Sequence, residues 1–323
     1  MPEQAEAGIS KFGARSTALE VIAGHDLKGR DGIVTGGASG IGVETVRALA
    51  TAGARVVIAT RDQTKGESVA ATLRKETGSD LIEFQTLDLA SLASVRSFVT
   101  QFLGLRRDLH LLINNAGIMA TPLSYTTDGF ESQFGTNHIG HFALAVGLLP
   151  ALKAAGRARV VSLSSLGHRR SEVHFEDISF RERPYDPWMS YGQSKTANVL
   201  FAVGMTQRFA SEGINANAVH PGGIMTGLQK YVPHEEQVKM GWIDEAGAQN
   251  TRFKTTEQGA ATSIWAAVAP ELEGVCGRYL EDCTIAKPWS DDRPMSGVKA
   301  YALDPGNAER LWSVSEELVA RAG

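Results

Sequence analysis

A glycine-rich turn near the start of the chain constrains its fold more than any other feature. Residues 31–49 have the sequence DGIVTGGASGIGVETVRAL, so a short apolar run enters the turn and an amphipathic pattern leaves it. This order predicts a β-strand, a tight turn and an α-helix. Glycines lack the Cβ that would hold a ligand away from the backbone, and helix N-termini attract phosphate. The pattern therefore predicts a dinucleotide site, although a ligand-free turn can have the same glycines. The expected contacts are Gly36, Ser39, Gly40, Ile41 and Gly42.

Short apolar runs alternate with longer amphipathic segments along the rest of the chain. The expected strands cover 54–60, 81–89, 109–113, 159–164, 214–219 and 277–280, and the expected helices cover 91–103, 128–154, 187–209, 259–268 and 305–322. Continuous apolar runs such as ARVVIAT are typical of strands buried on both faces of a parallel sheet. This alternation predicts an α/β protein with a single Rossmann-type, doubly wound parallel sheet and helices on both faces.

We expect one domain over residues 29–323, preceded by an N-terminal extension, residues 1–28. The extension should contain one short helix, because Thr17 and Glu20 form a capping-box pair. Two long segments, 167–187 and 222–254, interrupt the alternation. Such loops after the carboxyl ends of strands are where these sheets bind ligands. We expect 222–254 to be a substrate loop, and the alternative is a surface excursion whose apolar residues pack back on the core.

Charge and cysteine content exclude several kinds of partner. The formal net charge of −4 gives no reason to expect nucleic acid or an anionic membrane. Cys276 and Cys283 belong to no zinc-binding cluster, so neither a metal site nor a disulfide framework is expected. The first residues form no continuous apolar stretch, and no segment offers about 20 uninterrupted apolar residues. We therefore expect a cytoplasmic protein without a membrane anchor.

Tyr191 and Lys195 stand four residues apart in the expected helix at 187–209. This spacing places them on one helix face, about 6 Å apart along the axis. A phenol is a poor acid or base at neutral pH, but a neighbouring cation lowers its pKa. We therefore expect Lys195 to make Tyr191 a general acid or base. The same spacing also occurs in helices that carry no chemistry.

Two polar residues earlier in the chain complete a candidate catalytic group. Ser165 follows the expected strand 159–164, where its hydroxyl should donate a hydrogen bond to a substrate carbonyl. Asn137 lies within the expected helix 128–154, although asparagine is a poor helix former. A side-chain amide that holds a water between Lys195 and solvent would explain its presence. A turn at the strand end is the alternative for either of the adjacent serines.

Taken together, these residues resemble the short-chain dehydrogenase/reductase family. Over residues 26–268 the family's motifs occur in its order: Thr-Gly-x-x-x-Gly-Ile-Gly at 35–42, Asn-Asn-Ala-Gly at 114–117, Asn137, Ser165, Tyr191, Lys195 and His-Pro-Gly at 220–222. Segments 164–168, 175–178 and 191–198 are most similar to the retinol-dehydrogenase-like branch. Membrane-bound members of that branch carry an apolar N-terminal anchor that this chain lacks, which counts against a retinoid substrate.

The resemblance implies an enzyme that interconverts a lipophilic ketone or aldehyde and its alcohol by hydride transfer. Tyr191 would donate the proton in reduction and Ser165 would position the carbonyl. Lys195 would also hold the nicotinamide ribose, and Asn137 would support a water relay. Further implied cofactor contacts are Asp88, Leu89, Asn115, Ala116, Gly117, Pro221, Gly222, Ile224 and Thr226. The alternatives are a non-catalytic dinucleotide-binding sensor or scaffold and another Rossmann enzyme such as a methyltransferase, neither of which needs Tyr191 and Lys195.

The end of the second expected strand bears on the choice of cofactor. Enzymes that prefer NAD usually place a carboxylate there, whereas this chain has Ala59 and Thr60 followed by Arg61. A guanidinium at this point suits a 2′-phosphate. Asp62 complicates the argument, because it can neutralise Arg61 or bind the ribose itself. We expect NADP(H) to be favoured over NAD(H).

The helices expected at 128–154 and 187–209 flank the catalytic strands, and in this family such helices commonly pair between two subunits. Small residues on them would allow close approach: Ala143, Ala145, Gly147, Ala197, Ala202 and Gly204. We therefore expect a homodimer. In one alternative these residues pack on their own sheet, and in another the tail, with Trp312 and Leu318, covers the helices of a monomer.

Overall fold

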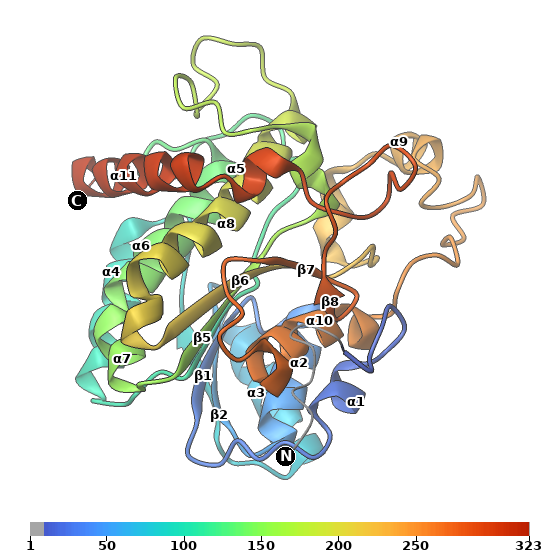
Figure 1. Cartoon of the computed structure of the whole chain (residues 1–323). Helices are drawn as coiled ribbons and strands as arrows, with labels where there is room; N and C mark the ends of the chain where they lie inside the picture. Colours follow the sequence, from blue (N-terminus) through green and yellow to red (C-terminus); the bar gives the residue numbers. More distant parts are fainter. Residues whose placement is uncertain (1–9, 323) are drawn as a thin grey trace, which may run out of the picture.

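The computed structural model describes residues 10–322, and within them the strands form one eight-stranded sheet (Figure 1). The strand order is β3-β2-β1-β4-β5-β6-β7-β8, and every neighbouring pair is parallel except β7 and β8. The strands are β1 (Asp31–Thr35), β2 (Arg55–Thr60), β3 (Ile82–Thr86), β4 (Leu111–Asn114), β5 (Ala158–Leu163), β6 (Ile214–His220), β7 (Tyr279–Glu281) and β8 (Thr284–Ile285). The predicted fold class is confirmed.

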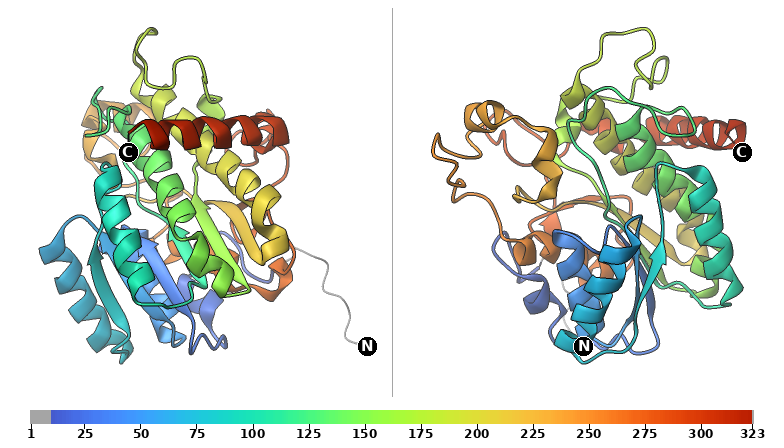
Figure 2. Two further views of the ribbon diagram at one scale, coloured as in Figure 1. Left: turned by 90° about the vertical axis from the view of Figure 1, so that its left-hand side faces the viewer. Right: turned by 180° about the vertical axis from the view of Figure 1, so that it is seen from behind.

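Helices cover both faces of this sheet (Figures 1 and 2). One face carries α2 (Ile41–Thr51), α3 (Gln63–Thr77) and α10 (Thr256–Val268), with α1 (Ala18–Ile22) packed on α10. The other face carries α4 (Leu92–Gly104), α6 (Gly140–Gly147), α7 (Leu149–Ala154) and α8 (Pro187–Phe209). Trp265 is fully buried in the first layer, and Phe98 and Phe102 are fully buried in the second. Burial on both faces explains why the central strands are apolar.

The chain reverses its winding between β1 and β4, which are neighbours in the sheet. Loops that leave the sheet in opposite directions at such a point open a crevice at the carboxyl ends of the strands. Two hydrogen bonds join these loops, because Asn115 Nδ2 donates to Thr35 O at 2.7 Å and Asn115 N–H donates to Thr35 Oγ1 at 2.9 Å. They hold the floor of the crevice in place.

The helix expected at 128–154 starts later and is interrupted. It begins with α5 (Ser132–Phe134), passes through a π-helical turn, Gly135–Ile139, and continues as α6 and α7. The carboxylate of Glu131 caps this start, because it accepts the N–H groups of Gln133 and Phe134 at 3.0 and 2.8 Å. Asp128 instead accepts the distant Leu92 N–H at 2.8 Å. Because its carboxylate is held by another part of the chain, Asp128 stays outside the helix.

Two other elements differ from expectation. The strand expected at 81–89 ends at Thr86, so Asp88 lies in the turn that follows it. The antiparallel strand β8 was not expected. Its hairpin turn runs through Asp282 and Cys283, which have φ angles of 50° and 55°. Cysteine rarely adopts this left-handed conformation, and glycine or asparagine would have marked the turn in the sequence.

The N-terminal extension holds one end of the loop at 222–254. Its helix α1 starts with the predicted capping box, in which Thr17 and Glu20 each accept the other's main-chain N–H. Just before it, the Arg15 guanidinium donates to Phe253 O at 3.0 Å and to Thr251 O at 3.1 Å. The loop itself contains a 3₁₀ turn, Gly227–Tyr231, and α9 (His234–Lys239), and it stands over the carboxyl edge of the sheet (Figure 1). The domain boundary at 28/29 remains a prediction.

The C-terminal helix α11 (Pro305–Arg321) lies across α8 (Figure 2). The Trp312 ring stacks on Phe201 with centroids 6.1 Å apart and meets Phe142 edge-on at 4.9 Å. A Cβ added at Gly204 would lie 3.1 Å from the Trp312 ring. At least this small residue of α8 therefore accommodates the chain's own tail. Over the described residues, every helix is too short or too polar to cross a bilayer.

Candidate active site

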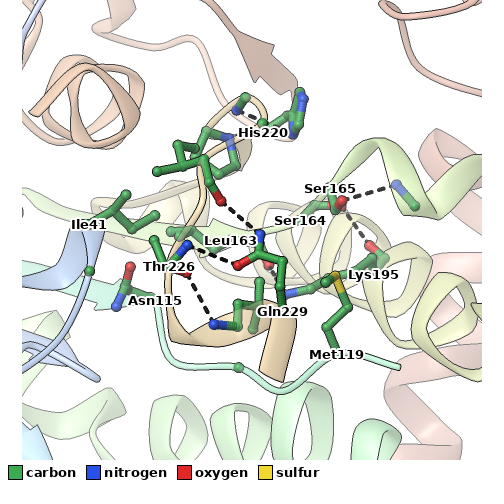
Figure 3. A pocket seen from close by; sticks show the side chains of 18 of the residues that line it. Ile41, Asn115, Met119, Leu163, Ser164, Ser165, Lys195, His220, Thr226 and Gln229 are labelled. Carbon is green, nitrogen blue, oxygen red and sulfur yellow. Dashed lines mark hydrogen bonds between the residues drawn. The ribbon is translucent and has the colours of Figure 1, made fainter. Parts of the chain in front are cut away.

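A cavity of about 1160 Å³ opens at the carboxyl edge of the sheet (Figure 3). Ile41 and Asn115 lie on one side of it, and Ser165 and Lys195 lie on the other (Figure 3). Most of the predicted site residues line it: Gly36, Ser39, Gly40, Ile41, Arg61, Asp88, Leu89, Asn115, Ala116, Gly117, Ser165, Tyr191, Lys195, Pro221, Gly222, Ile224 and Thr226. Gly42 and Asn137 lie behind this surface and do not line the cavity.

The glycine turn after β1 fits the pyrophosphate of a dinucleotide. Gly36 and Gly40 have φ angles of 65° and 52°, which side chains disfavour. Gly40 is the N-cap of α2 and provides no side-chain cap, so N–H groups of the first helical turn remain for a phosphate. A Cβ on Gly42 would lie 2.3 Å from Gly36 O. Gly42 is therefore needed for packing beneath the turn, and its predicted contact with a dinucleotide stays a prediction.

Arg61 and Lys65 line the cavity beyond the end of β2. Asp62 lies between them and caps α3, because its Oδ1 accepts the Lys65 N–H at 3.0 Å. Neither cation forms an ion pair with a carboxylate in residues 10–322. The alternative in which Asp62 neutralises Arg61 is thus not seen. Lys65 was not predicted as a site residue. Its position in the first turn of the helix that follows β2 is the sequence feature that could have indicated it.

Tyr191, Lys195 and Ser165 come together as expected. Tyr191 and Lys195 lie on α8 and are 4% and 5% exposed. Lys195 Nζ donates to Leu163 O at 3.0 Å and lies 5.6 Å from the centroid of the Tyr191 ring. Ser165 lies beside the Tyr191 phenol, and its Oγ accepts the Gly167 N–H at 3.0 Å. A hydroxyl pair beside a buried cation is an arrangement that can bind and protonate a carbonyl oxygen.

The expected effect of Lys195 on Tyr191 is not seen. Burial raises the pKa of the Tyr191 phenol to about 12, although the neighbouring Ser165 hydroxyl opposes this rise. Burial also lowers the pKa of the Lys195 amine to about 8. The loss of hydration outweighs the lysine charge because Nζ is directed to the Leu163 carbonyl. The phenol therefore keeps its proton at neutral pH, as a proton donor must.

Asn137 hydrogen bonds to protein groups on two sides. Its Oδ1 accepts the Ile118 N–H at 2.9 Å, and its Nδ2 donates to Ile118 O and to Ser194 Oγ, both at 2.9 Å. Both amide hydrogens are thus used by protein groups, Oδ1 keeps a second lone pair, and the expected water stays a prediction. The residue lies in the π-helical turn and clamps the strand after β4 against α8. It is a positioning residue.

An apolar wall faces the reactive side of Tyr191. Met119, Trp188, Leu228 and Trp242 pack around the ring, and all four line the cavity. Trp188 meets Tyr191 edge-on at 6.4 Å and Trp242 edge-on at 5.9 Å. Met119 and Trp188 were not predicted. Trp188 could have been found, because it precedes Tyr191 by three residues and so shares its helix face.

His168 is a further residue that the sequence did not single out. Its Nδ1 lies 2.7 Å from Ser165 O, and its Nε2 accepts the Lys299 N–H at 3.2 Å. Because Nε2 accepts, Nδ1 carries the proton and donates to Ser165. Burial lowers the pKa of His168 to about 4, so the ring stays neutral. It fixes the backbone of the candidate catalytic serine.

Several known proteins are similar to this chain. The family model described as short chain dehydrogenase matches residues 32–237. A probable oxidoreductase of Streptomyces antibioticus is 47% identical over 302 residues, which cover 92% of this chain and all of that protein. Retinol dehydrogenase 12 of Mus musculus is 41% identical over 91% of this chain and 87% of its own. A crystal structure from Mycobacterium paratuberculosis superposes with a TM-score of 0.73 at 34% identity, covering 95% of this chain and 98% of the other.

Proposed function

Because the chain belongs to the short-chain dehydrogenase/reductase family, we propose that it interconverts a lipophilic ketone or aldehyde and its alcohol with NADP(H). The observation that carries this proposal is the protonated, buried Tyr191 phenol, which lies between Ser165 and an apolar wall at the cavity surface. A bound nicotinamide dinucleotide supplies the hydride in reduction and accepts it in oxidation.

The residues of the chain divide the remaining work. Ser165 donates a hydrogen bond to the carbonyl oxygen, which Tyr191 then protonates as the alcohol forms. Lys195, with Asn115 and the glycine turn, contributes to binding the dinucleotide. Asn137 binds the Ser194 hydroxyl of α8, and His168 binds the main-chain carbonyl of Ser165, so both position the residues that act on the substrate. In oxidation the tyrosinate form of Tyr191 accepts the alcohol proton.

The choice of NADP(H) rests on Arg61 and Lys65. Both cations line the cavity at the end of β2, without an ion-pair partner in the described chain. A ribose 2′-phosphate would supply the negative charge that pairs with these cations. Asp62, the carboxylate that would suit a free ribose hydroxyl, is used as the cap of α3. The cytoplasmic location stays a prediction.

We propose that the protein is a monomer, because its own C-terminal helix covers α6 and α8. Trp312 of α11 packs on Phe142 and Phe201 from these two helices, where a second subunit was expected to dock. A partner at this surface would have to displace a helix of 17 residues with its buried tryptophan.

Loss of NADPH absorbance in the presence of medium-chain ketones, aldehydes and aromatic carbonyl compounds tests the activity. The account predicts turnover of some of them and slower turnover with NADH. Tight NADPH binding without turnover of any substrate, in either direction, would favour the non-catalytic sensor instead.

A further inference from the structure

The cavity extends past Tyr191 to three cations that the proposed mechanism does not use. Arg169, Arg170 and Lys299 line this part of the cavity, and together we name them the cationic rim. Arg169 and Lys299 are half-buried and Arg170 is exposed. Lysine and arginine are seldom even partly withdrawn from water without a partner, so the location of Arg169 and Lys299 requires an explanation.

The two arginines stand next to the catalytic group. They end the 3₁₀ turn Leu166–Arg170, which follows Ser165 directly. This turn packs closely on α8, because a Cβ added at Gly167 would lie 2.8 Å from Cε1 of Tyr191. The Arg170 guanidinium lies 5.2 Å from the ring centroid of Trp188, the residue that meets Tyr191 edge-on. Arg170 thus borders the apolar wall described above.

Lys299 joins the arginines from a distant part of the chain. Its main-chain N–H donates to His168, inside the turn that carries the arginines. Its Nζ lies 3.3 Å from the ring centroid of Trp289, which also lines the cavity. The Trp289 Nε1–H is buried and has no hydrogen-bond partner in residues 10–322. An indole donor without an acceptor is therefore added to the three positive charges.

The carboxylates of this region form no ion pair with the cationic rim, although the charge of Glu281 acts on Arg169 and offsets one of the three positive charges. Glu281 Oε1 accepts the Gly297 N–H at 2.9 Å, and Asp282 pairs with Lys254 at 2.5 Å. Within the part of the chain that the structure describes, none of the three rim cations forms an ion pair. Arg169 does use its Nε, which donates to Leu166 O at 3.2 Å. The rim consequently offers several donors and a net positive charge.

We propose that the substrate carries a carboxylate, which binds Arg169, Arg170 and Lys299 while its apolar body lies against Met119, Trp188 and Trp242. Arginine suits this group because its planar fork can bind both carboxylate oxygens. The substrate class is then an oxo or hydroxy acid with an apolar chain or ring between the two polar ends. This inference rests on the proposed oxidoreductase function for the reacting end of the molecule.

Turnover tests the inference first. ω-Oxo alkanoic acids of increasing length are compared with their methyl esters, which keep the aldehyde and remove the charge. We expect KM for the best acid to be about tenfold lower than for its ester, as one charge-assisted contact would give. The preference should weaken as salt is added. Equal KM values for acids and esters at every length would overturn the inference and leave the proposed function intact.

Variants assign the preference to the rim. Arg170→Gln and Lys299→Gln should each reduce the preference for acid over ester, and the double variant should abolish it. Lys287→Gln is the matched control, because Lys287 is exposed on the same segment and does not line the cavity. It should keep the full preference. A preference that survives in the double variant would place the carboxylate elsewhere and overturn the assignment.

A binding experiment separates the inference from the proposed function. Quenching of tryptophan fluorescence by unreactive alkanoates is compared with quenching by the corresponding alkanamides, in the presence of NADP. We expect tighter binding of the alkanoates, lost in the double variant. If this is seen and no carbonyl compound is turned over, the inference holds and the proposed reaction fails. Equal binding of alkanoates and alkanamides would contradict the inference whatever the enzyme turns over.

Discussion

Replacement of Arg61 by alanine probes the cofactor preference most sharply. A hydrogen bond to a charged group contributes about 1.5 to 3 kcal/mol, but exposed charges are screened by water. Arg61 is exposed, so we assign its contact with a 2′-phosphate about 1 to 2 kcal/mol. Because about 1.4 kcal/mol corresponds to a factor of ten, Arg61→Ala should raise the NADPH dissociation constant about five- to thirtyfold. The dissociation constant of NADH should barely change, since NADH has no 2′-phosphate.

Fluorescence titration of both cofactors gives these constants directly. Arg96→Ala is a suitable control, because Arg96 is also an exposed arginine and lies on α4, outside the cavity lining. Asp62→Asn should leave the preference for NADPH in place, since an asparagine still caps α3. If the unmodified protein bound both cofactors equally, or if Arg61→Ala weakened both alike, the role of Arg61 would have to be abandoned.

Three further predictions concern stability and oligomeric state. Asn137→Ala leaves the Ile118 N–H and C=O groups without their partner, so urea unfolding should show a loss of about 1 to 3 kcal/mol, and an unchanged midpoint would contradict the clamp. Burial lowers the pKa of His138 and His220 to about 3 and that of His141 and His168 to about 4. In the unfolded chain these histidines have their ordinary pKa of about 6.5. Below that pH the unfolded chain therefore binds more protons than the folded protein. Stability should therefore be complete above that pH and fall as pH drops through 6 towards 4; a midpoint of urea unfolding that did not move between pH 7 and pH 5 would refute this. Light scattering should give a mass near 34.6 kDa, whereas twice that mass would restore the homodimer.

The sheet and the catalytic group could be predicted from sequence because their patterns are local. The glycine turn is flanked by its own strand and helix, and the four-residue spacing of Tyr191 and Lys195 lies within one helix. These patterns needed only the periodicity of strands and helices. The order of the motifs then limited the fold to one family.

Features that depend on distant parts of the chain could not be predicted. The start of α5 depends on Asp128 being held by Leu92, and the position of Lys299 depends on His168, far earlier in the sequence. The pKa of Tyr191 depends on burial, whose cost in lost hydration outweighs the charge four residues away. Small residues on α8 predicted close approach by a helix correctly, but not that the helix would be α11.

Conversion of Tyr191 to phenylalanine tests the central claim most directly, because it removes the transferable proton and keeps the ring. General acid catalysis contributes about 10² to 10⁴ to a rate, so kcat for the best carbonyl substrate should fall at least about a hundredfold. The NADPH dissociation constant should stay within a few fold. Tyr125→Phe, which alters a partly exposed tyrosine outside the cavity, should leave kcat unchanged. If Tyr191→Phe retained more than about a tenth of the unmodified activity, Tyr191 would not be the proton donor and the proposed mechanism would be wrong.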